Sequence, residues 1–226
     1  MIYYGNDNKV INTDGFKYVN RGMKACIYEK DGLVFKKFNT DTQPKYILKK
    51  KVFKKLKSLD IPHFITLDNY YYQFKGLNEL LCIDAYTYKY IDQDNTTLLF
   101  QDKEYILEMV NGLTKAIDCF TKNGIGLFDC HSGNIIFSEN DVTIIDPDMF
   151  YLSKMPSRIL SKKNKIEVLN YIKSTLNSNI EKYCDSSYYY NYAKLFDFKV
   201  NSDTDIVKEL DSKIKEKTIY NSLRNK

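Results

Sequence analysis

The sequence contains few of the residues from which disulfide scaffolds and metal centres are built. Its five cysteines are scattered without a Cys-x-x-Cys pair, and its only histidines are His63 and His131. An odd number of dispersed cysteines excludes a disulfide framework and a zinc module, and two histidines exclude a histidine-rich metal site. We therefore expect a reducing, cytoplasmic setting.

Long hydrophobic runs and linker-type residues are also scarce. No stretch approaches the ~18 consecutive apolar residues that a membrane-spanning helix needs. The first ten residues lack the basic and apolar regions of a secretion signal, although export without a cleaved signal stays open. Only four prolines and nine glycines occur among 226 residues, which excludes a linker-rich or fibrous chain. The sequence predicts no membrane span.

The residues that are abundant indicate a compact, globular chain. Hydrophobic residues make up 43% of the sequence, including 20 tyrosines and 13 phenylalanines, and 28% of the residues are charged. This composition excludes disorder as the main state. The net charge of +5 is too small for a nucleic-acid footprint covering the domain, so we expect no nucleic-acid partner.

The hydropathy pattern divides the chain into a strand-rich part and a helical part. Residues 18–28, 33–38 and 66–91 have β-rich patterns, and apolar residues at helical spacing predict a helix over 45–59. An Asp31-Gly32 pair, typical of hairpin turns, separates the first two strands.

The second part is helical around one hairpin. Apolar periodicity predicts helices over 103–123, 164–180 and 204–217, and strands over 134–137 and 142–145. Strands followed by helices are typical of the α+β class. We expect one domain with two lobes, a β-rich lobe of residues 1–88 and a mainly helical lobe of residues 89–226.

Polar residues flank the expected hairpin. Asp129 and Asn134 stand before it, and Asp146 follows its second strand. Because a hairpin brings its ends together, Asn134 and Asp146 should face one point that Asp129 can reach. Oxygen ligands without soft donors suit Mg²⁺, which usually accompanies substrate phosphates. The alternative is that Asp129 and Asn134 only satisfy amides of the loop, as most loop Asp and Asn residues do.

Two segments, DCHSGN at 129–134 and IIDPD at 144–148, resemble the catalytic and metal-binding loops of the protein-kinase-like superfamily. Residues 18–38 resemble the glycine-rich loop and the lysine strand of that family, with Gly22 and Lys36 at the matching positions. The resemblance implies a bilobal fold and an ATP-dependent kinase with ATP and Mg²⁺ as cofactors.

Roles for individual residues follow from the resemblance alone. It implies that Asp129 orients the acceptor hydroxyl or accepts its proton, and that Asn134 and Asp146 bind Mg²⁺. It further implies that Lys36 neutralises the α- and β-phosphates and that Gly22 belongs to the loop covering them.

Further positions match the family less closely. His131 either contacts the transferred phosphoryl group or only hydrogen-bonds within its loop, and both interpretations stay open. Residues 85–92, AYTYKYID, resemble the hinge that receives adenine. We expect Asp148 to be a solvated turn carboxylate rather than a further metal ligand.

The largest departure concerns the partner of Lys36. In the family a glutamate of the first helix pairs with this lysine, but no glutamate occurs between Glu29 and Glu79. Asp41, Gln43 or Glu79 are the candidate substitutes. Because of this departure, the alternative of a pseudokinase stays open, that is, a module that binds nucleotide and a partner without catalysing transfer. We favour an active enzyme, because the residues nearest the chemistry are present.

The acceptor is the least determined feature. The stretch from Tyr90 to Asp129 is nearly filled by one expected helix, which leaves little chain to enclose a small molecule. We therefore expect a minimal Ser/Thr protein kinase, with a small-molecule kinase resembling aminoglycoside or choline kinases as the alternative. Lysines dominate residues 45–57, and no acid follows until Asp60. They form either a solvated helix face or a docking surface for an acidic partner.

Overall fold

The computed structural model places two compact units and confirms the predicted α+β class. The first unit comprises residues 1–60, 65–92 and 147–151, and the second comprises 61–64, 93–146 and 152–226. The residues that the structure describes are 1–6, 9–74, 82–91, 103–129, 132–138, 141–183 and 194–216.

The first unit is built on a seven-stranded antiparallel sheet with the order β2-β1-β6-β7-β5-β4-β3. At the turn between β4 and β5, Asp31 and Gly32 both have positive φ, of 51° and 77°, as the predicted hairpin requires. The strands are β1 (Ile2–Gly5), β2 (Val10–Asn12), β3 (Lys17–Arg21), β4 (Ala25–Lys30), β5 (Leu33–Phe38), β6 (Leu67–Tyr72) and β7 (Ala85–Lys89).

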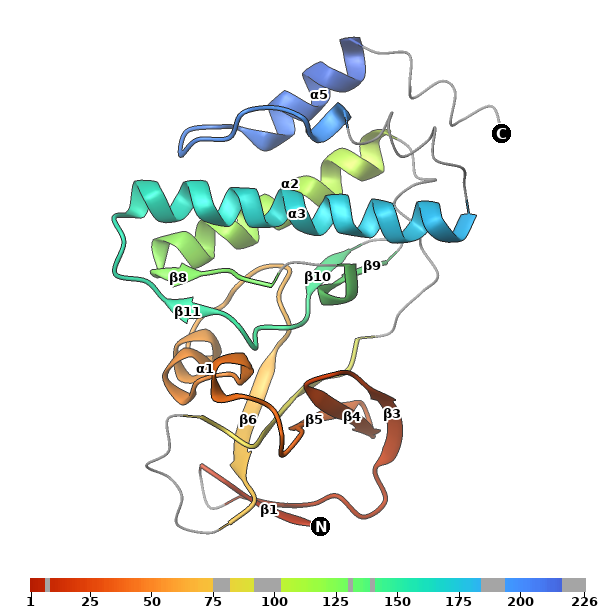
Figure 1. Cartoon of the computed structure of the whole chain (residues 1–226), viewed down its shortest axis with the longest axis vertical. Coiled ribbons are helices and arrows are strands. Elements are labelled where there is room, and N and C mark those ends of the chain that lie inside the picture. Colours follow the sequence, from red (N-terminus) through yellow and green to blue (C-terminus); the bar gives the residue numbers. More distant parts are fainter. Residues whose placement is uncertain are drawn as a thin grey trace. The chain divides into compact units, whose positions relative to one another are not determined.

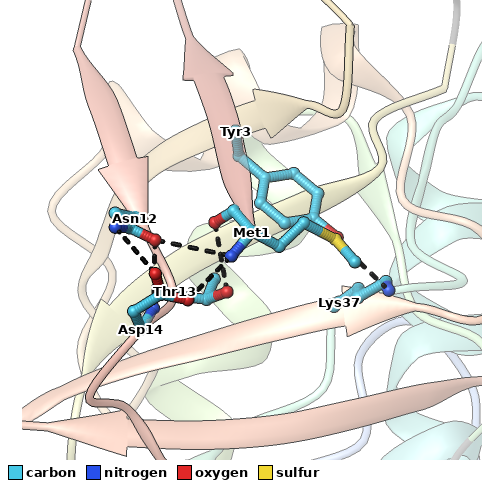
Figure 2. Close-up of polar contacts among 6 residues, drawn as sticks. All are labelled: Met1, Tyr3, Asn12, Thr13, Asp14 and Lys37. Atoms are coloured by element: carbon cyan, nitrogen blue, oxygen red, sulfur yellow. Dashed lines mark hydrogen bonds and ion pairs between the residues drawn. The ribbon is translucent and has the colours of Figure 1, made fainter.

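Strands β1 and β2 were not predicted, and polar contacts at the start of β1 help to hold them together (Figure 2). The Met1 amino group lies 2.9 Å from Asp14 Oδ1 and 3.4 Å from Asn12 Oδ1. The hydrogen bonds that this amino group and Asn12 donate to the Asp14 carboxylate lower its pKa below the ordinary value. The Tyr3 hydroxyl also donates to the sulfur of Met1, at 3.1 Å.

A short helix and an aromatic cluster complete the first unit. Helix α1 (Lys50–Lys57) buries an apolar face and contacts β6, and the Phe53 and Tyr70 rings meet edge to face at 5.3 Å. The helix begins later than predicted because Lys49 has an extended backbone and forms an isolated bridge with Cys82. The 3₁₀ turn η1 (Pro44–Tyr46) precedes it.

Three helices dominate the described part of the second unit, α2 (Lys103–Lys122), α3 (Ser157–Tyr183) and α5 (Ile206–Glu216). Helix α2 contacts both α3 and α5, and Figure 1 shows it running behind α3. Gly124, with φ 68°, follows α2 where the predicted carboxyl-terminal cap belongs. None of the helices in the described ranges is both long and apolar enough to cross a membrane.

Short elements connect these helices. A hairpin joins β9 (Ile135–Phe137) to β10 (Val142–Ile144), and β10 contacts α2. Helix α3 starts at Ser157, before its predicted first residue, because its first turn has exposed residues at 157–159 and only Leu160 is buried there. The remaining elements are β8 (Ile125–Gly126), β11 (Tyr151–Leu152), which pairs with β8, and the 3₁₀ turns η3 (Ser132–Asn134) and η4 (Lys194–Phe196).

The segment Ile61–Phe64 packs on α2 and β10. The carbonyl of His63 accepts a hydrogen bond from the Ile144 amide at 2.9 Å, and its Nδ1 lies 2.8 Å from Asp141 Oδ1. A Cβ atom at Gly112 of α2 would lie only 2.9 Å from the His63 ring. The same Cβ would lie 3.1 Å from Val142 Cγ1, so the close approach of both side chains favours glycine at position 112.

We expect Gly112→Ala to lower the free energy of unfolding by about 1–3 kcal/mol through overpacking. The clash should outweigh the gain of up to ~1 kcal/mol that alanine brings to a helix interior. Urea unfolding measures the change. In a His63→Ala background, where only the 3.1 Å approach to Val142 Cγ1 remains, the loss should be smaller, and an equal loss in both backgrounds would exclude the imidazole as the cause.

Candidate functional site

The hairpin places the two polar segments of the second unit beside each other. Its strands pair in the register Val142–Phe137, Thr143–Ile136 and Ile144–Ile135. One residue beyond this ladder, the Ile145 amide donates a hydrogen bond to the Asn134 carbonyl at 3.0 Å. The backbone of Asn134 is thereby bonded to the residue that directly precedes Asp146.

The Asn134 side chain holds the loop that carries Asp129. Asn134 is 4% exposed, and its Nδ2 donates to the Asp129 backbone carbonyl at 2.8 Å. This contact is of the kind that a purely structural loop would make. It also leaves the amide oxygen of Asn134 as the atom suited to a cation, because the nitrogen is the donor.

Asp129 adopts an uncommon backbone conformation. Its φ is 66°, in the left-handed region, where Asp and Asn are several-fold enriched among non-glycine residues. Its side chain is half-buried, as is that of Asp146. Strained backbone often clusters at functional sites, so this loop is a candidate for one.

The residue types at the two ends of the hairpin are those that bind hard cations. In the described ranges, no group of three or more His, Cys, Asp or Glu side chains is close enough to hold a metal. Asp129, Asn134 and Asp146 offer two carboxylates and one amide, all hard oxygen donors. Mg²⁺ is commonly bound by one or two carboxylates plus water and substrate phosphates, so oxygen donors of this type suit Mg²⁺.

A fully buried residue that the sequence analysis missed supports the same loop from α3. Asn164 accepts a hydrogen bond from the Leu127 amide at 2.9 Å through its Oδ1. Its Nδ2 donates to the Ile125 carbonyl and to Thr121 Oγ1, both at 3.0 Å. One asparagine thus fixes the backbone two residues before Asp129. In the sequence Asn164 stood at the start of a predicted helix, where asparagine is common as a cap.

The predicted lysine lies in the first unit and is buried in an ion pair. Lys36 Nζ lies 2.7 Å from Asp148 Oδ2, and the two side chains are 8% and 3% exposed. The Tyr86 hydroxyl donates to the other carboxylate oxygen of Asp148 at 2.9 Å, and Lys36 Nζ lies 5.7 Å from the centroid of the Tyr86 ring.

The expectation that Asp148 is a solvated turn carboxylate is wrong. Residues 147–150 turn back so that the Phe150 amide bonds the Pro147 carbonyl at 3.0 Å, and Phe150 is 2% exposed. Burial of this turn takes Asp148 out of water beside Lys36. Of the partners predicted for Lys36, Asp41 and Gln43 are exposed, and Glu79 lies outside the described residues.

The structure describes two of the three remaining predicted features, the glycine turn and the hinge segment. Gly22 lies in the exposed turn between β3 and β4, where its amide bonds the Ala25 carbonyl at 2.9 Å. Most of the segment predicted to be a hinge, Ala85–Lys89, is strand β7 inside the sheet, because both its edges pair with neighbouring strands. His131 lies outside the described residues.

Comparisons with known proteins assign the chain to no family. No protein-family model matches the sequence, and no curated protein matches it significantly.

Proposed function

We propose that this chain is an ATP-dependent phosphotransferase that transfers the γ-phosphate to a hydroxyl group, with a protein as its acceptor. The observation that carries the proposal is the linkage of Asn134 to both polar segments. Its side chain bonds the Asp129 carbonyl and its own carbonyl accepts from the Ile145 amide. Two hydrogen bonds thus tie the loop of Asp129 to the strand end that precedes Asp146.

In this proposal the protein mainly supplies alignment and charge neutralisation. Asp129 orients the acceptor hydroxyl and accepts its proton, while Asn134 and Asp146 hold Mg²⁺ through their oxygen atoms. Mg²⁺, when bound, neutralises negative charge on the phosphates. Lys36 binds the α- and β-phosphates. These roles suit phosphoryl transfer, which depends on positioning and electrostatic stabilisation more than on covalent chemistry.

A protein acceptor agrees with the basic surface of the first unit. Lys51 and Lys54 of α1 are exposed, whereas Lys57 donates to the Asp68 carbonyl and Lys45 lies over the Tyr46 ring at 4.6 Å. Some lysines of this region are thus engaged locally and others face solvent. The solvent-facing lysines favour an acceptor protein with an acidic surface.

The experiment that tests the function is transfer of labelled phosphate from ATP, with and without Mg²⁺, into a cell lysate and into acidic and basic peptide pools. We expect Mg²⁺-dependent labelling of protein and a preference for the acidic pool. Labelling of small molecules alone would instead support a metabolite kinase. Nucleotide binding without transfer to any acceptor would support an interaction module.

Gly22 offers a test of the loop that is expected to cover the phosphates. Its φ is not positive, and the nearest atom to an added Cβ is the Ala25 carbonyl oxygen at 3.8 Å. The protein itself therefore tolerates alanine there. We expect Gly22→Ala to leave the melting temperature unchanged and to weaken ATP binding, because a glycine allows the backbone to approach the phosphates closely. Calorimetric titration checks this, and unchanged affinity would remove Gly22 from the site.

A further inference from the structure

The Lys36–Asp148 pair is a buried ion pair within the first unit, unlike an ion pair on the surface. Both side chains are almost fully buried, and their charged atoms are 2.7 Å apart. A buried charge is costly unless it is paired and hydrogen-bonded. Asp148 meets both conditions, since Lys36 contacts Oδ2 and the Tyr86 hydroxyl donates to Oδ1.

The sheet explains why two groups converge on one carboxylate. Lys36 of β5 and Tyr86 of β7 are directly opposite each other in the antiparallel register. Side chains at opposed positions lie on the same face of a sheet. The lysine and the tyrosine therefore present a cation and a hydroxyl donor side by side, and Asp148 pairs with the cation and accepts a hydrogen bond from the hydroxyl.

The turn that carries Asp148 is also anchored by its neighbours. Phe150 is buried and its amide closes the turn onto Pro147, while Lys24 Nζ lies 3.4 Å from the sulfur of Met149. Pro147 fixes its own φ near −65°. The carboxylate is therefore held by a constrained backbone rather than by a freely moving loop.

We propose that Asp148 positions the ammonium group of Lys36 for the nucleotide phosphates, a proposal that rests on the function proposed above. Asp148 would be the acidic partner of Lys36, a role for which no glutamate is present between Glu29 and Glu79. It is a positioning residue, because it acts through Lys36 rather than on the nucleotide.

Asp148 is a close neighbour in the chain of Asp146, the proposed Mg²⁺ ligand. Only Pro147 separates it from Asp146, so chain geometry keeps the two aspartate Cα atoms within about 7 Å. One three-residue stretch therefore carries a proposed Mg²⁺ ligand and the counterion of the phosphate-binding lysine.

A double-mutant cycle on ATP affinity, measured by calorimetric titration in the presence of Mg²⁺, tests the proposal. We expect Lys36→Met and Asp148→Asn each to weaken binding about tenfold or more, the scale of coupling between contacting charged groups. The double variant should bind no more weakly than Lys36→Met alone. Additive losses would show that Asp148 does not act through Lys36 and would overturn the proposal.

Two further variants separate positioning from a merely structural role. Asp148→Glu keeps the charge and should recover most of the affinity lost in Asp148→Asn. Tyr86→Phe keeps the ion pair and should weaken ATP binding by less than Asp148→Asn does. If Asp148→Glu and Tyr86→Phe both bind as weakly as Lys36→Met, the carboxylate has no specific role and the proposal fails.

The stability of the variants distinguishes failure of this proposal from failure of the proposed function. Exchanging the pair for apolar residues, Lys36→Met with Asp148→Leu, should preserve the folded state, because it leaves no unpaired buried charge. Asp148→Asn alone should lower the melting temperature more than this exchange does. If the wild type binds no nucleotide, the proposed function fails. If it binds nucleotide and Asp148→Asn binds equally well, only the positioning role fails.

Discussion

Replacing Asp129 by asparagine should lower kcat for phosphate transfer by about 10²–10⁴-fold, the usual contribution of a positioned general base. Asparagine retains the size of the side chain but cannot accept the proton of the acceptor hydroxyl. Affinity for ATP should change little, because the proposed phosphate contacts come from Lys36 and from Mg²⁺ held by Asn134 and Asp146. Initial rates of labelled phosphate transfer under saturating ATP measure the effect.

The backbone of Asp129 makes asparagine a better substitution than alanine. With φ at 66°, residue 129 is in a region that Asn adopts readily, because its short polar side chain can hydrogen-bond locally, and that is costly for alanine. Asp129→Asn should therefore unfold at the wild-type denaturant concentration, whereas Asp129→Ala should lose about 1 kcal/mol. An asparagine variant with undiminished kcat would remove Asp129 from the catalytic role, whatever the behaviour of the alanine variant.

Replacing Asn164 by leucine should lower the free energy of unfolding by about 3–5 kcal/mol. The change removes three hydrogen bonds and leaves the buried Leu127 amide and the Ile125 carbonyl without their partner. Each buried polar group deprived of its partner costs about 1–3 kcal/mol. Transfer activity should fall as well, at temperatures where the variant is folded, because the backbone leading to Asp129 loses its support. Urea unfolding and residual kcat are the measurements.

Thr121→Val is the matched control for this prediction. It removes only the hydroxyl that accepts from Asn164 Nδ2 and leaves the two backbone contacts of that side chain in place. Its cost should be about 1 kcal/mol, the net value of a single hydrogen bond. Equal losses in Asn164→Leu and Thr121→Val would show that the backbone contacts contribute little.

Local patterns predicted most of the elements correctly. Helix α2, the β9–β10 hairpin and the Asp31-Gly32 turn appear where apolar spacing and turn residues indicated them. Each depends on neighbours within a few residues, which is the range over which periodicity and turn chemistry act. Strands β1 and β2 were missed because β1 joins the sheet by pairing with β6, far along the chain, and that pairing is not encoded by a local pattern.

The amino-acid sequence alone established the α+β class and the order of the polar residues around the hairpin, because both follow from short-range patterns. The partner of Lys36 and the role of Asn164 depended on the folded chain. Lys36 and Asp148 are far apart in sequence, and a carboxylate after a proline looks like any solvated turn residue until the turn is buried. Burial and long-range pairing are properties of packing, so the environment of a charge is decided by tertiary contacts rather than by its neighbours in the chain.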